Sequence, residues 1–366
     1  MKTAKEKTES PKKPPSERCR HRRSYVPGRK LKIIVLYNKV EKLLRGLPVD
    51  ILPERDTLDT ARDVSHALKL LGHQVSLFAV NEETYKDIFR LQADLFFNLA
   101  EGVGSLPGTE YKIPQLLEKL KVPFTGADVQ NIKDTTDKGK TKRVIKKNGL
   151  STPYYRIFKN GHLKIPKNFT FPLIVKPLAE DCSLGIFSSK AVVSTRRTLK
   201  NRIKFIHQYY KQPALVENFI NTREVNVAVI GNGKKTRALP ISEIVFGPYF
   251  DKKKLWKIVD FAAKWQTNTK RYKQTIGVCP ADLPENLTKK IKAAAVRAYK
   301  LLKCRDYARV DIRIDEDGKF YILEINSNPS ISDSTDCGLT RSAKAAGFTY
   351  KKLIDFLVKS ALERKN

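Results

Sequence analysis

The C-terminal part of the chain contains a segment whose pattern allows little besides a β-hairpin. Residues 307–314 and 320–326 alternate polar and apolar side chains, and Asp317-Gly318 between them is typical of a tight turn. If Asp317 and Gly318 form a two-residue loop, Glu316 pairs with Lys319 and the numbers of every facing pair add up to 635. The register of the whole hairpin then follows from the turn.

This register brings two carboxylates together, because Asp311 is expected to face Glu324 while Arg309 faces Asn326. Facing Cβ atoms lie about 4.5–5.5 Å apart, and like charges at that distance destabilise a sheet. A divalent cation would remove the penalty, and carboxylates with the Asn326 carbonyl suit Mg²⁺ or Mn²⁺ better than zinc. The alternative is a pair of solvated acids on an exposed ladder. The opposite face is predicted to form a core from Val310, Ile312, Leu323 and Ile325.

Length and composition favour a multidomain globular protein. A chain of 366 residues exceeds the size at which one hydrophobic core usually stops growing, so two or three domains are expected. No apolar run approaches the roughly 18 residues that span a bilayer, and the first thirty residues lack the apolar segment of a secretory signal. The five cysteines are far apart and are interpreted as free thiols. We expect a cytoplasmic protein without a membrane span.

The formal net charge is +33, of which residues 1–30 carry eight units through eleven Lys and Arg against three acids. The remaining +25 belongs to the folded part. Such a field attracts polyanions in general and identifies none of them, and a compositional bias would produce the same charge. Residues 1–30 combine Pro, Ser, Lys and Arg and are predicted to be a disordered basic tail.

From Leu31 onward the pattern alternates strands and helices. Strands are predicted over 31–37, 75–80 and 95–99, and helices over 59–71 and 113–121. This alternation indicates a parallel sheet covered by helices, with ligands beyond the carboxyl ends of the strands. The loop of residues 98–109 is therefore a candidate wall of the site, although turn chemistry alone also explains its glycines.

Two further units follow. The first is predicted to contain a basic helix over 137–148, a strand over 171–176, a polar loop over 177–185 and a strand from Ile186. The second contains a strand near 215–220, a long basic segment over 251–273, a helix over 287–303 and the hairpin.

Three strand ends offer groups for a nucleotide. Lys176 leaves an apolar strand beside a loop of small residues, where its ammonium and the loop N–H groups could meet a phosphate. The segment 217–220 could offer backbone hydrogen bonds to an adenine edge, and Glu224 could reach a ribose hydroxyl. Each of these residues alone is ordinary at a strand end.

Taken in order, the motifs resemble the ATP-grasp superfamily and most closely the D-alanine–D-alanine ligase family. The resemblance covers about residues 31–360. It rests on Pro123-Phe124-Thr125-Gly126, Asp137-Lys138, Thr141-Lys142, residues 174–177, 217–224, Arg309-Val310-Asp311, 323–329 and Ala345-Ala346-Gly347. It implies an α/β protein of three domains after the tail: an N-terminal parallel α/β domain (31–126), an ATP-grasp small lobe (127–216) and a C-terminal lobe with the metal site (217–366). The nucleotide would lie between two α+β lobes.

The resemblance also implies roles for individual residues. Lys138 and Lys176 would contact the ATP phosphates, together with Cys182 and Ser183 of the phosphate loop. Glu217, Asn218, Phe219 and Ile220 would hold the adenine, and Glu224 the ribose. Asp311, Glu324 and Asn326 would hold two magnesium ions. Arg309 would stabilise the transition state, Lys264 would approach the γ-phosphate from a mobile loop, and Ser330 would border the pocket for the carbonyl oxygen.

The chain departs from the family pattern on the substrate side. The glutamate that binds the amino group of the first D-alanine falls at Ala61, with Asp59 and Asp63 as substitutes, and Glu101-Gly102 stands where the ligases carry His-Gly. Ser330 replaces a glycine. In the phosphate loop, Asp181 and Cys182 stand where Gly and Ser are usual, which brings a negative charge near the triphosphate.

These features predict an ATP- and magnesium-dependent carboxylate–amine ligase that acts on amino acids or small peptides through an acyl phosphate. D-Alanine ligation ranks below a related amino-acid or dipeptide ligation. One alternative is a nucleotide- or polyanion-binding protein that kept the fold without catalysis. Another is a ligase that acts on an anionic macromolecule through the basic surface. The resemblance is compatible with a homodimer.

Overall fold

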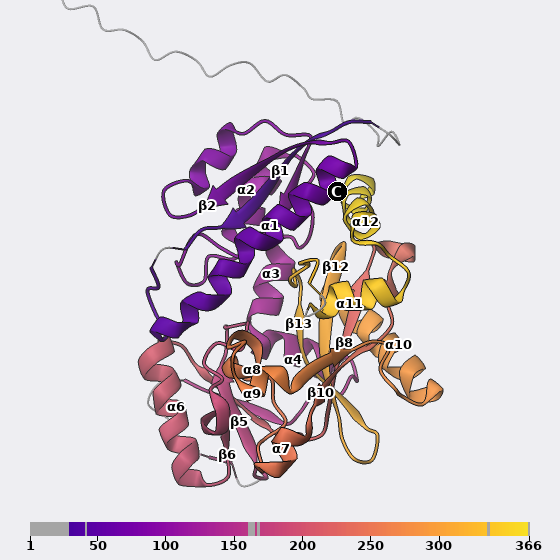
Figure 1. Cartoon of the computed structure of the whole chain (residues 1–366). Coiled ribbons are helices and arrows are strands. Elements are labelled where there is room, and N and C mark those ends of the chain that lie inside the picture. The colour runs from indigo at the N-terminus through magenta and orange to yellow at the C-terminus, as the bar shows by residue number, and fades with distance from the viewer. Residues whose placement is uncertain (1–28, 41, 160–164, 167–168, 335–336, 365–366) are drawn as a thin grey trace, which may run out of the picture.

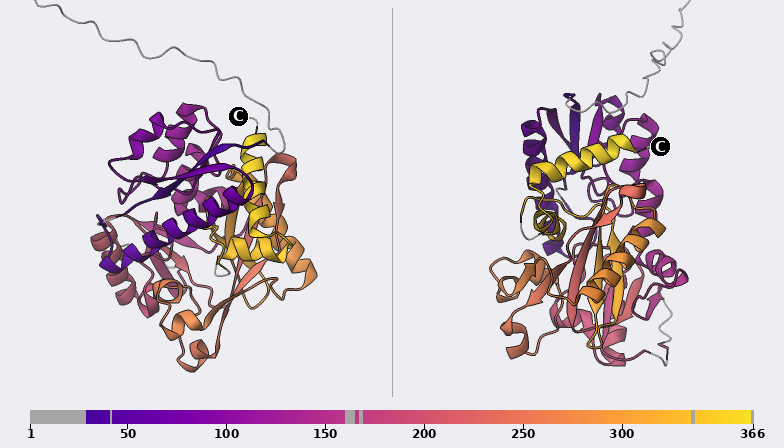
Figure 2. Two further views of the ribbon diagram at one scale, coloured as in Figure 1. Left: turned by 45° about the horizontal axis from the view of Figure 1, so that its top comes forward. Right: turned by 90° about the vertical axis from the view of Figure 1, so that its right-hand side faces the viewer.

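Three β-sheets organise the computed structural model, which describes residues 29–40, 42–159, 165–166, 169–334 and 337–364 (Figure 1). The predicted basic tail, apart from its last two residues, lies outside the described residues. The parallel sheet lies at one end of the molecule, and the two antiparallel sheets lie together at the other end (Figure 2). This arrangement confirms the expected fold class of a parallel α/β domain followed by two α+β lobes.

The N-terminal sheet has the order β2-β1-β3, and both pairings are parallel. Its strands are β1 (Lys32–Asn38), β2 (Gln74–Val80) and β3 (Leu95–Asn98), close to the predicted ranges. The helices are α1 (Leu52–Leu70) and α2 (Lys112–Leu120), with the 3-10 turns η1 (Pro48–Ile51) and η2 (Tyr85–Arg90). Helix α1 begins seven residues before the predicted start. It ends where predicted, because Gly72 adopts a left-handed φ of 86°.

The small lobe is an antiparallel sheet of order β4-β7-β5-β6 backed by one long helix. Its elements are β4 (Tyr155–Phe158), β5 (Leu173–Pro177), α5 (Ser188–Ala191), β6 (Val192–Val193), α6 (Arg196–Tyr210) and β7 (Ala214–Asn218). The predicted strand from Ile186 is wrong, because the chain forms the short helix α5 there and only two residues pair as β6. Val193 of this apolar run belongs to the hydrophobic core of the small lobe, and Phe187 packs against that core.

The C-terminal lobe is a larger antiparallel sheet of order β11-β10-β8-β12-β13, with β9 beside β8. Its strands are β8 (Arg223–Ile230), β9 (Arg237–Ala238), β10 (Ser242–Phe246), β11 (Thr275–Val278), β12 (Tyr307–Ile314) and β13 (Phe320–Asn326). Its helices are η3 (Gly233–Lys235), α7 (Pro248–Lys252), α8 (Phe261–Trp265), α9 (Lys270–Lys273), α10 (Glu285–Leu301), α11 (Gly338–Ala345) and α12 (Tyr350–Glu363). The basic segment over 251–273 is thus a series of short helices.

Packing between the units crosses the proposed domain boundaries. Helices α3 (Val129–Thr136), which the sequence pattern did not indicate, and α4 (Lys138–Lys147) lie beside β13, and Ile145 enters the core of the C-terminal lobe. Helix α12 returns to the N-terminal domain and packs against α1 (Figure 1). The division at 126/127 and 216/217 stays a proposal. Among the described residues, no helix is both long and apolar enough to cross a membrane.

The β12–β13 hairpin has the predicted partners at its open end and different ones near the turn. Asp311 faces Glu324 and Arg309 faces Asn326, as expected. The loop, however, has three residues, because Asp315 N donates to Lys319 O at 2.8 Å and Gly318 N donates to Asp315 O at 3.1 Å. Gly318 at φ 76° makes this turn possible. The predicted Glu316–Lys319 pair is therefore wrong.

A β-bulge restores the register beyond the turn. Ile312 faces Ile322 while Asp311 faces Glu324, so Leu323 is the extra residue on β13. The bulge also exchanges two side chains: Ile322 is fully buried in the core, whereas Leu323 borders the cleft described below. The prediction of Leu323 as a core residue is wrong for this reason. The shift at the turn and the bulge cancel before the acidic pair.

Candidate active site

One cleft collects every residue that the sequence analysis selected for catalysis, nucleotide binding or metal binding. The cleft has a volume of about 830 Å³ and lies among the carboxyl end of the N-terminal sheet, the loop after β5 and one face of the C-terminal sheet. The predicted wall formed by the loop after β3 is present, since Glu101 and Gly102 line it. The selected residues that line the cleft are Lys138, Lys176, Cys182, Ser183, Glu217, Asn218, Phe219, Ile220, Glu224, Lys264, Arg309, Asp311, Glu324, Asn326 and Ser330.

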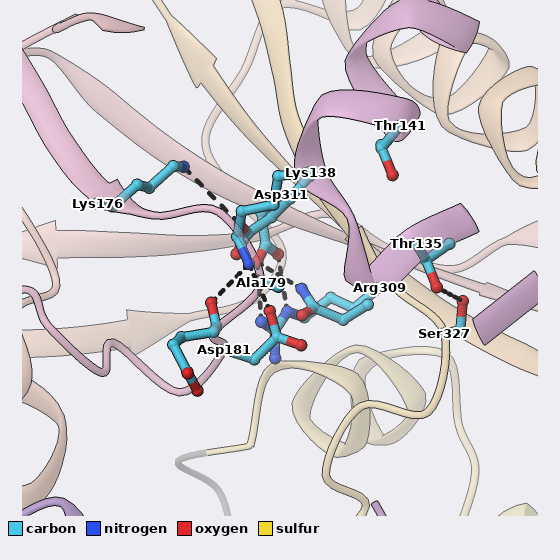
Figure 3. A network of polar contacts seen from close by, with 12 residues as sticks. Thr135, Lys138, Thr141, Lys176, Ala179, Asp181, Arg309, Asp311 and Ser327 are labelled. Carbon is cyan, nitrogen blue, oxygen red and sulfur yellow. Dashed lines mark hydrogen bonds and ion pairs between the residues drawn. The ribbon is translucent and has the colours of Figure 1, made fainter. Parts of the chain in front are cut away.

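Asp311 lies at the centre of a hydrogen-bond network on the sheet (Figure 3). Arg309 donates to both of its carboxylate oxygens, from Nε at 2.7 Å and from Nη2 at 2.8 Å. Asn226, which faces Asp311 from β8, donates at 2.7 Å, and Asn326 donates at 3.0 Å. The guanidinium offsets the charge of Asp311, so this carboxylate does not depend on a metal for compensation.

Glu324 is compensated by lysines from two other elements. Its Oε2 lies 3.6 Å from Lys138 Nζ on α4 and 3.8 Å from Lys176 Nζ at the end of β5. Burial acts to raise the pKa of Glu324, but Lys138, Lys176 and Arg309 outweigh it and hold the value at about 2. Glu324 is therefore ionised across the physiological pH range.

The donor set suits a hard divalent cation. Two carboxylates and the carbonyl oxygen of Asn326, whose Nδ2 points to Asp311, lie on one face of the hairpin. Oxygen ligands of this kind are those that Mg²⁺ prefers. Repulsion between the two acids does not by itself require a cation, as the sequence pattern suggested, because Arg309 and the lysines already offset both charges.

A second buried network joins α4 to the small lobe. Lys176 faces Leu215 on β7 and so lies diagonal to Glu217, whose Oε2 it meets at 2.8 Å. Glu217 also pairs with Lys142 of α4, which in turn donates to Thr152 Oγ1 at 2.9 Å. All three charged side chains are nearly inaccessible. Burial acts to raise the pKa of Glu217, but Lys142 and Lys176 outweigh it and lower the pKa, so its carboxylate is ionised between them.

Lys138, the other lysine predicted to contact the ATP phosphates, is held by the loop after β5. Its Nζ donates to the Glu180 carbonyl oxygen at 2.6 Å and to Asp181 Oδ1 at 2.7 Å. Burial alone would lower the pKa of Lys138, but Asp181 and Glu324 outweigh it and raise the value. Figure 3 shows the side chains of Lys138, Asp181, Arg309 and Asp311 converging.

The same loop, residues 179–186, is fixed along its length. Cys182 and Ser183 both adopt left-handed backbone conformations, at φ 55° and 60°, which are uncommon for residues other than glycine. Gly185 packs so closely that an added Cβ would approach Pro177 Cγ to 2.7 Å. We interpret residues 179–186, from here on the phosphate loop, as the predicted anion-binding loop.

The basic segment around α8 closes over the phosphate loop. Trp265 Nε1 donates to Cys182 O at 2.9 Å, and Ser183 Oγ donates to Val259 O at 2.8 Å. Lys264 lies next to this contact, with its Nζ 5.1 Å from the centre of the Trp265 ring. The lysine expected on a mobile loop is thus on the short helix α8, docked onto the phosphate loop.

The predicted adenine segment is mostly engaged in the sheet. Asn218 N donates to Tyr154 O and Phe219 N donates to Pro172 O, both at 3.0 Å. Arg313 Nη1 donates to Ile220 O at 3.2 Å and also pairs with Glu224, the predicted ribose ligand. A base bound here would use the remaining polar groups of 217–220.

The cleft has no acidic side chain at position 61, where the resemblance places the glutamate that binds a substrate amine. Ala61 is 0% exposed and belongs to the apolar core, so this position offers nothing to a substrate amine. Asp63 accepts hydrogen bonds from Ser332 Oγ and Asp333 N, at 3.4 and 3.2 Å, and ties α1 to the loop after β13. Asp59 lines the cleft but pairs with Arg62 on the exposed side of α1. Ser330 lines the cleft and is exposed.

Comparison with known proteins settles the family. The model of the D-ala D-ala ligase C-terminus matches residues 144–359. The chain is 32% identical over 343 residues to a D-alanine--D-alanine ligase of Polaromonas, covering 90% of this chain and 92% of that protein. It is 33% identical over 315 residues to the uncharacterized protein y4sG of Sinorhizobium fredii, covering 83% and 88%. The chain belongs to the D-alanine–D-alanine ligase family.

The fold of this ligase agrees with the assignment. The D-alanine--D-alanine ligase from Bacillus anthracis complexed with ATP superposes with a TM-score of 0.70 at 21% identity, covering 91% of this chain and 97% of that one. The ligase is therefore an ATP-dependent enzyme that forms amide bonds. The alternative of a binding protein without ligase activity is not favoured.

Sequence reasoning missed four polar residues of the site. Arg313 and Asn226 had a signal, because Arg309, Asp311 and Arg313 alternate on one face of β12 and Asn226 faces Asp311 from β8. Lys142 was noticed only as part of a motif. Arg45, which pairs with Glu180 at 2.7 Å, had no signal, because it lies in a loop of the N-terminal domain.

Proposed function

We propose that the ligase activates the carboxylate of an amino acid or small peptide as an acyl phosphate and joins it to an amine, with Mg²⁺ held by Asp311, Glu324 and Asn326. The observation that carries this proposal is the convergence of Arg309, Lys138 and Lys176 on the facing pair Asp311 and Glu324. Positive groups and oxygen ligands in one cleft are the requirements of phosphoryl transfer.

The reaction has two displacements. A carboxylate oxygen of the first substrate attacks the γ-phosphorus of ATP, and ADP leaves. The amine of the second substrate then attacks the acyl carbon, phosphate leaves, and the amine loses a proton to give a neutral amide. When bound, Mg²⁺ supplies charge neutralisation on the phosphate oxygens.

The protein's own residues position and stabilise the phosphoryl group. In this proposal Lys138 and Lys176 hold phosphate oxygens and Arg309 faces the charge that develops during transfer. Lys264, next to Trp265 and so beside the phosphate loop, approaches the γ-phosphate from α8. The contacts of α8 with the phosphate loop help to exclude water from the acyl phosphate.

The substrate pair is proposed to differ from two D-alanines. Support comes from the buried Ala61, from Asp63 being engaged with Ser332 and Asp333, and from Glu101 on the cleft wall where the ligases carry histidine. These changes affect the wall that receives a substrate amine and leave the proposed ATP and metal residues intact.

A screen of amino-acid pairs tests the proposal. Purified protein is incubated with ATP, Mg²⁺ and pairs of amino acids or dipeptides, D-alanine included, and phosphate release and product mass are measured. We expect phosphate release only with a productive pair, and a product whose mass is the sum of the substrates minus water. Phosphate release with every pair but no condensed product would reject amide formation.

A macromolecular substrate is a second candidate, favoured by the charge of +25 that remains outside residues 1–30. Turnover of an anionic macromolecule would fall steeply with salt, whereas turnover of a small substrate would not. We further propose a cytoplasmic location and a homodimer, which cell fractionation and sedimentation would test.

A further inference from the structure

The ammonium of Lys138 is surrounded by three oxygens in this structure. Its Nζ donates hydrogen bonds to Glu180 O at 2.6 Å and to Asp181 Oδ1 at 2.7 Å, and Glu324 Oε2 lies 3.6 Å away, within ion-pair distance. The side chain is only 3% exposed, so water does not provide an alternative partner. A phosphate oxygen that approaches Lys138 Nζ therefore competes with these oxygens for the ammonium.

Two of the three oxygens belong to residues that the fold holds in place. The Glu180 side chain accepts from Gln212 Nε2 at 2.7 Å and pairs with Arg45 at 2.7 Å, and Ala179 N donates to Gln212 Oε1 at 2.7 Å. These bonds hold the Glu180 carbonyl in place. Glu324 lies on β13, within the sheet.

Asp181 is the acceptor that can leave. Its side chain is 52% exposed, and Lys138 is its partner among the described ion pairs. When its side chain rotates toward solvent, Lys138 keeps the Glu180 carbonyl oxygen and the nearby Glu324 carboxylate as partners. Asp181 also carries the negative charge closest to the Lys138 ammonium, which contacts the ATP phosphates in the proposed function.

We propose that Asp181 is an internal substitute for a nucleotide phosphate, which holds Lys138 until the triphosphate of ATP displaces it. This inference rests on the proposed role of Lys138. It makes Asp181 a determinant of nucleotide affinity: ATP binding breaks the Lys138–Asp181 pair and brings a carboxylate near the triphosphate. A nucleoside without phosphates leaves the pair intact and does not sense Asp181.

The test measures the dissociation constants of ATP and adenosine by titration calorimetry, in Mg²⁺ and without amino acids. Asp181→Asn is expected to bind ATP about fivefold more tightly than the wild type, the factor that a half-exposed ion pair is worth. Adenosine affinity should not change. Asp181→Glu, which keeps the charge, should show no comparable gain. Asp59→Asn is the matched control, because Asp59 lines the same cleft and pairs with Arg62.

A double-mutant cycle identifies the partner of Asp181. In a Lys138→Met background the gain from Asp181→Asn should disappear, because the pair no longer exists. Unchanged or weaker ATP binding by Asp181→Asn in the wild-type background would overturn the inference. An unaltered ATP affinity of Lys138→Met would instead contradict the proposed role of Lys138. If Lys138→Met does not fold, the comparison of Asp181→Asn with Asp181→Glu still decides the question.

Discussion

Arg309 and Asp311 form a two-pronged ion pair on one face of β12, with N–O distances of 2.7 and 2.8 Å. The residues are two positions apart, so their side chains leave the strand on the same side. A planar guanidinium matches both carboxylate oxygens at once, which fixes its orientation as well as its charge. The pair places a permanent cation beside the acids of β12 and β13 before any substrate arrives.

We expect Arg309→Lys to lower kcat by at least about 100-fold, because an ammonium cannot reproduce the fork that orients the charge. The KM for ATP should change much less. Steady-state kinetics with a productive substrate pair measures both constants. Arg62→Lys, on the exposed side of α1, is the control. A kcat close to that of the wild type would show that Arg309 does not act on the reacting groups.

Glu324→Gln should leave the fold intact and abolish turnover. The amide keeps the shape of the side chain but removes the charge that would hold Mg²⁺. Circular dichroism checks the fold, and titration with Mn²⁺ followed by electron paramagnetic resonance measures cation binding with nucleotide present. Glu316→Gln, in the exposed hairpin loop, should behave as the wild type. Wild-type activity of Glu324→Gln would reject the metal role.

Lys176→Ala should weaken ATP binding by about 10- to 100-fold, the factor expected for a lost hydrogen bond between charged groups. Glu217 keeps Lys142 as a partner, so the buried network retains one ion pair. The dissociation constant of ATP is the measurement, with Lys204→Ala on the exposed surface of α6 as the control. An unchanged ATP affinity would count against the assignment of Lys176.

Glu217→Gln should destabilise the protein by about 3–5 kcal/mol, because Lys142 and Lys176 would lose the carboxylate that compensates their buried charges. Urea unfolding measures the change in the free energy of unfolding. Adding Lys142→Met to this variant should recover part of the loss, since it removes one uncompensated charge. A loss below about 1 kcal/mol would mean that water reaches the lysines.

We expect the stability of the protein to depend on pH through the ionisation of Glu180. Burial raises the pKa of its carboxyl from the ordinary 4.5 to about 7, against the opposing effect of Arg45. Between these values the folded protein keeps a proton that the unfolded chain has released. The contribution of Glu180 to stability is therefore greatest below pH 4.5 and is lost as the pH rises to 7.

Replacing Glu180 by Gln removes this titration. The melting temperature of Glu180→Gln relative to the wild type should therefore increase from pH 5 to pH 8. The same difference for Glu316→Gln, which is exposed, should be independent of pH. A constant difference for Glu180→Gln would show that its pKa is ordinary in the folded protein.

In the hairpin, local sequence rules predicted the facing pair Asp311 and Glu324 correctly but the length of the turn incorrectly. The Asp317-Gly318 signal located the turn correctly, but the loop has three residues, and the bulge at Leu323 compensates for the shift. The prediction still paired Asp311 with Glu324. The extra loop residue and the extra residue of the bulge shift the register by one residue each, in opposite directions. A bulge depends on packing against neighbouring strands, which a two-strand pattern does not contain.

At the start of α1 and after Ile186, local sequence rules predicted the secondary structure incorrectly. Helix α1 extends to Leu52, although the predicted helix begins only at residue 59. The apolar residues after Ile186 resemble a strand but form α5 and two paired residues. In both places, contacts with other parts of the chain decide the outcome over local preference.

The sequence pattern by itself determined most of the alternation of strands and helices and the facing of Asp311 and Glu324, while the resemblance to a ligase family supplied most of the other residues of the cleft. Periodicity and turn chemistry are properties of neighbouring residues, so they can be read along the chain. Only the tertiary structure decided which cation compensates which acid: Arg309 for Asp311, the lysines for Glu324, Asp181 for Lys138. These partners come mostly from separate elements, and their energies depend on distance and burial, which exist only once the chain has folded.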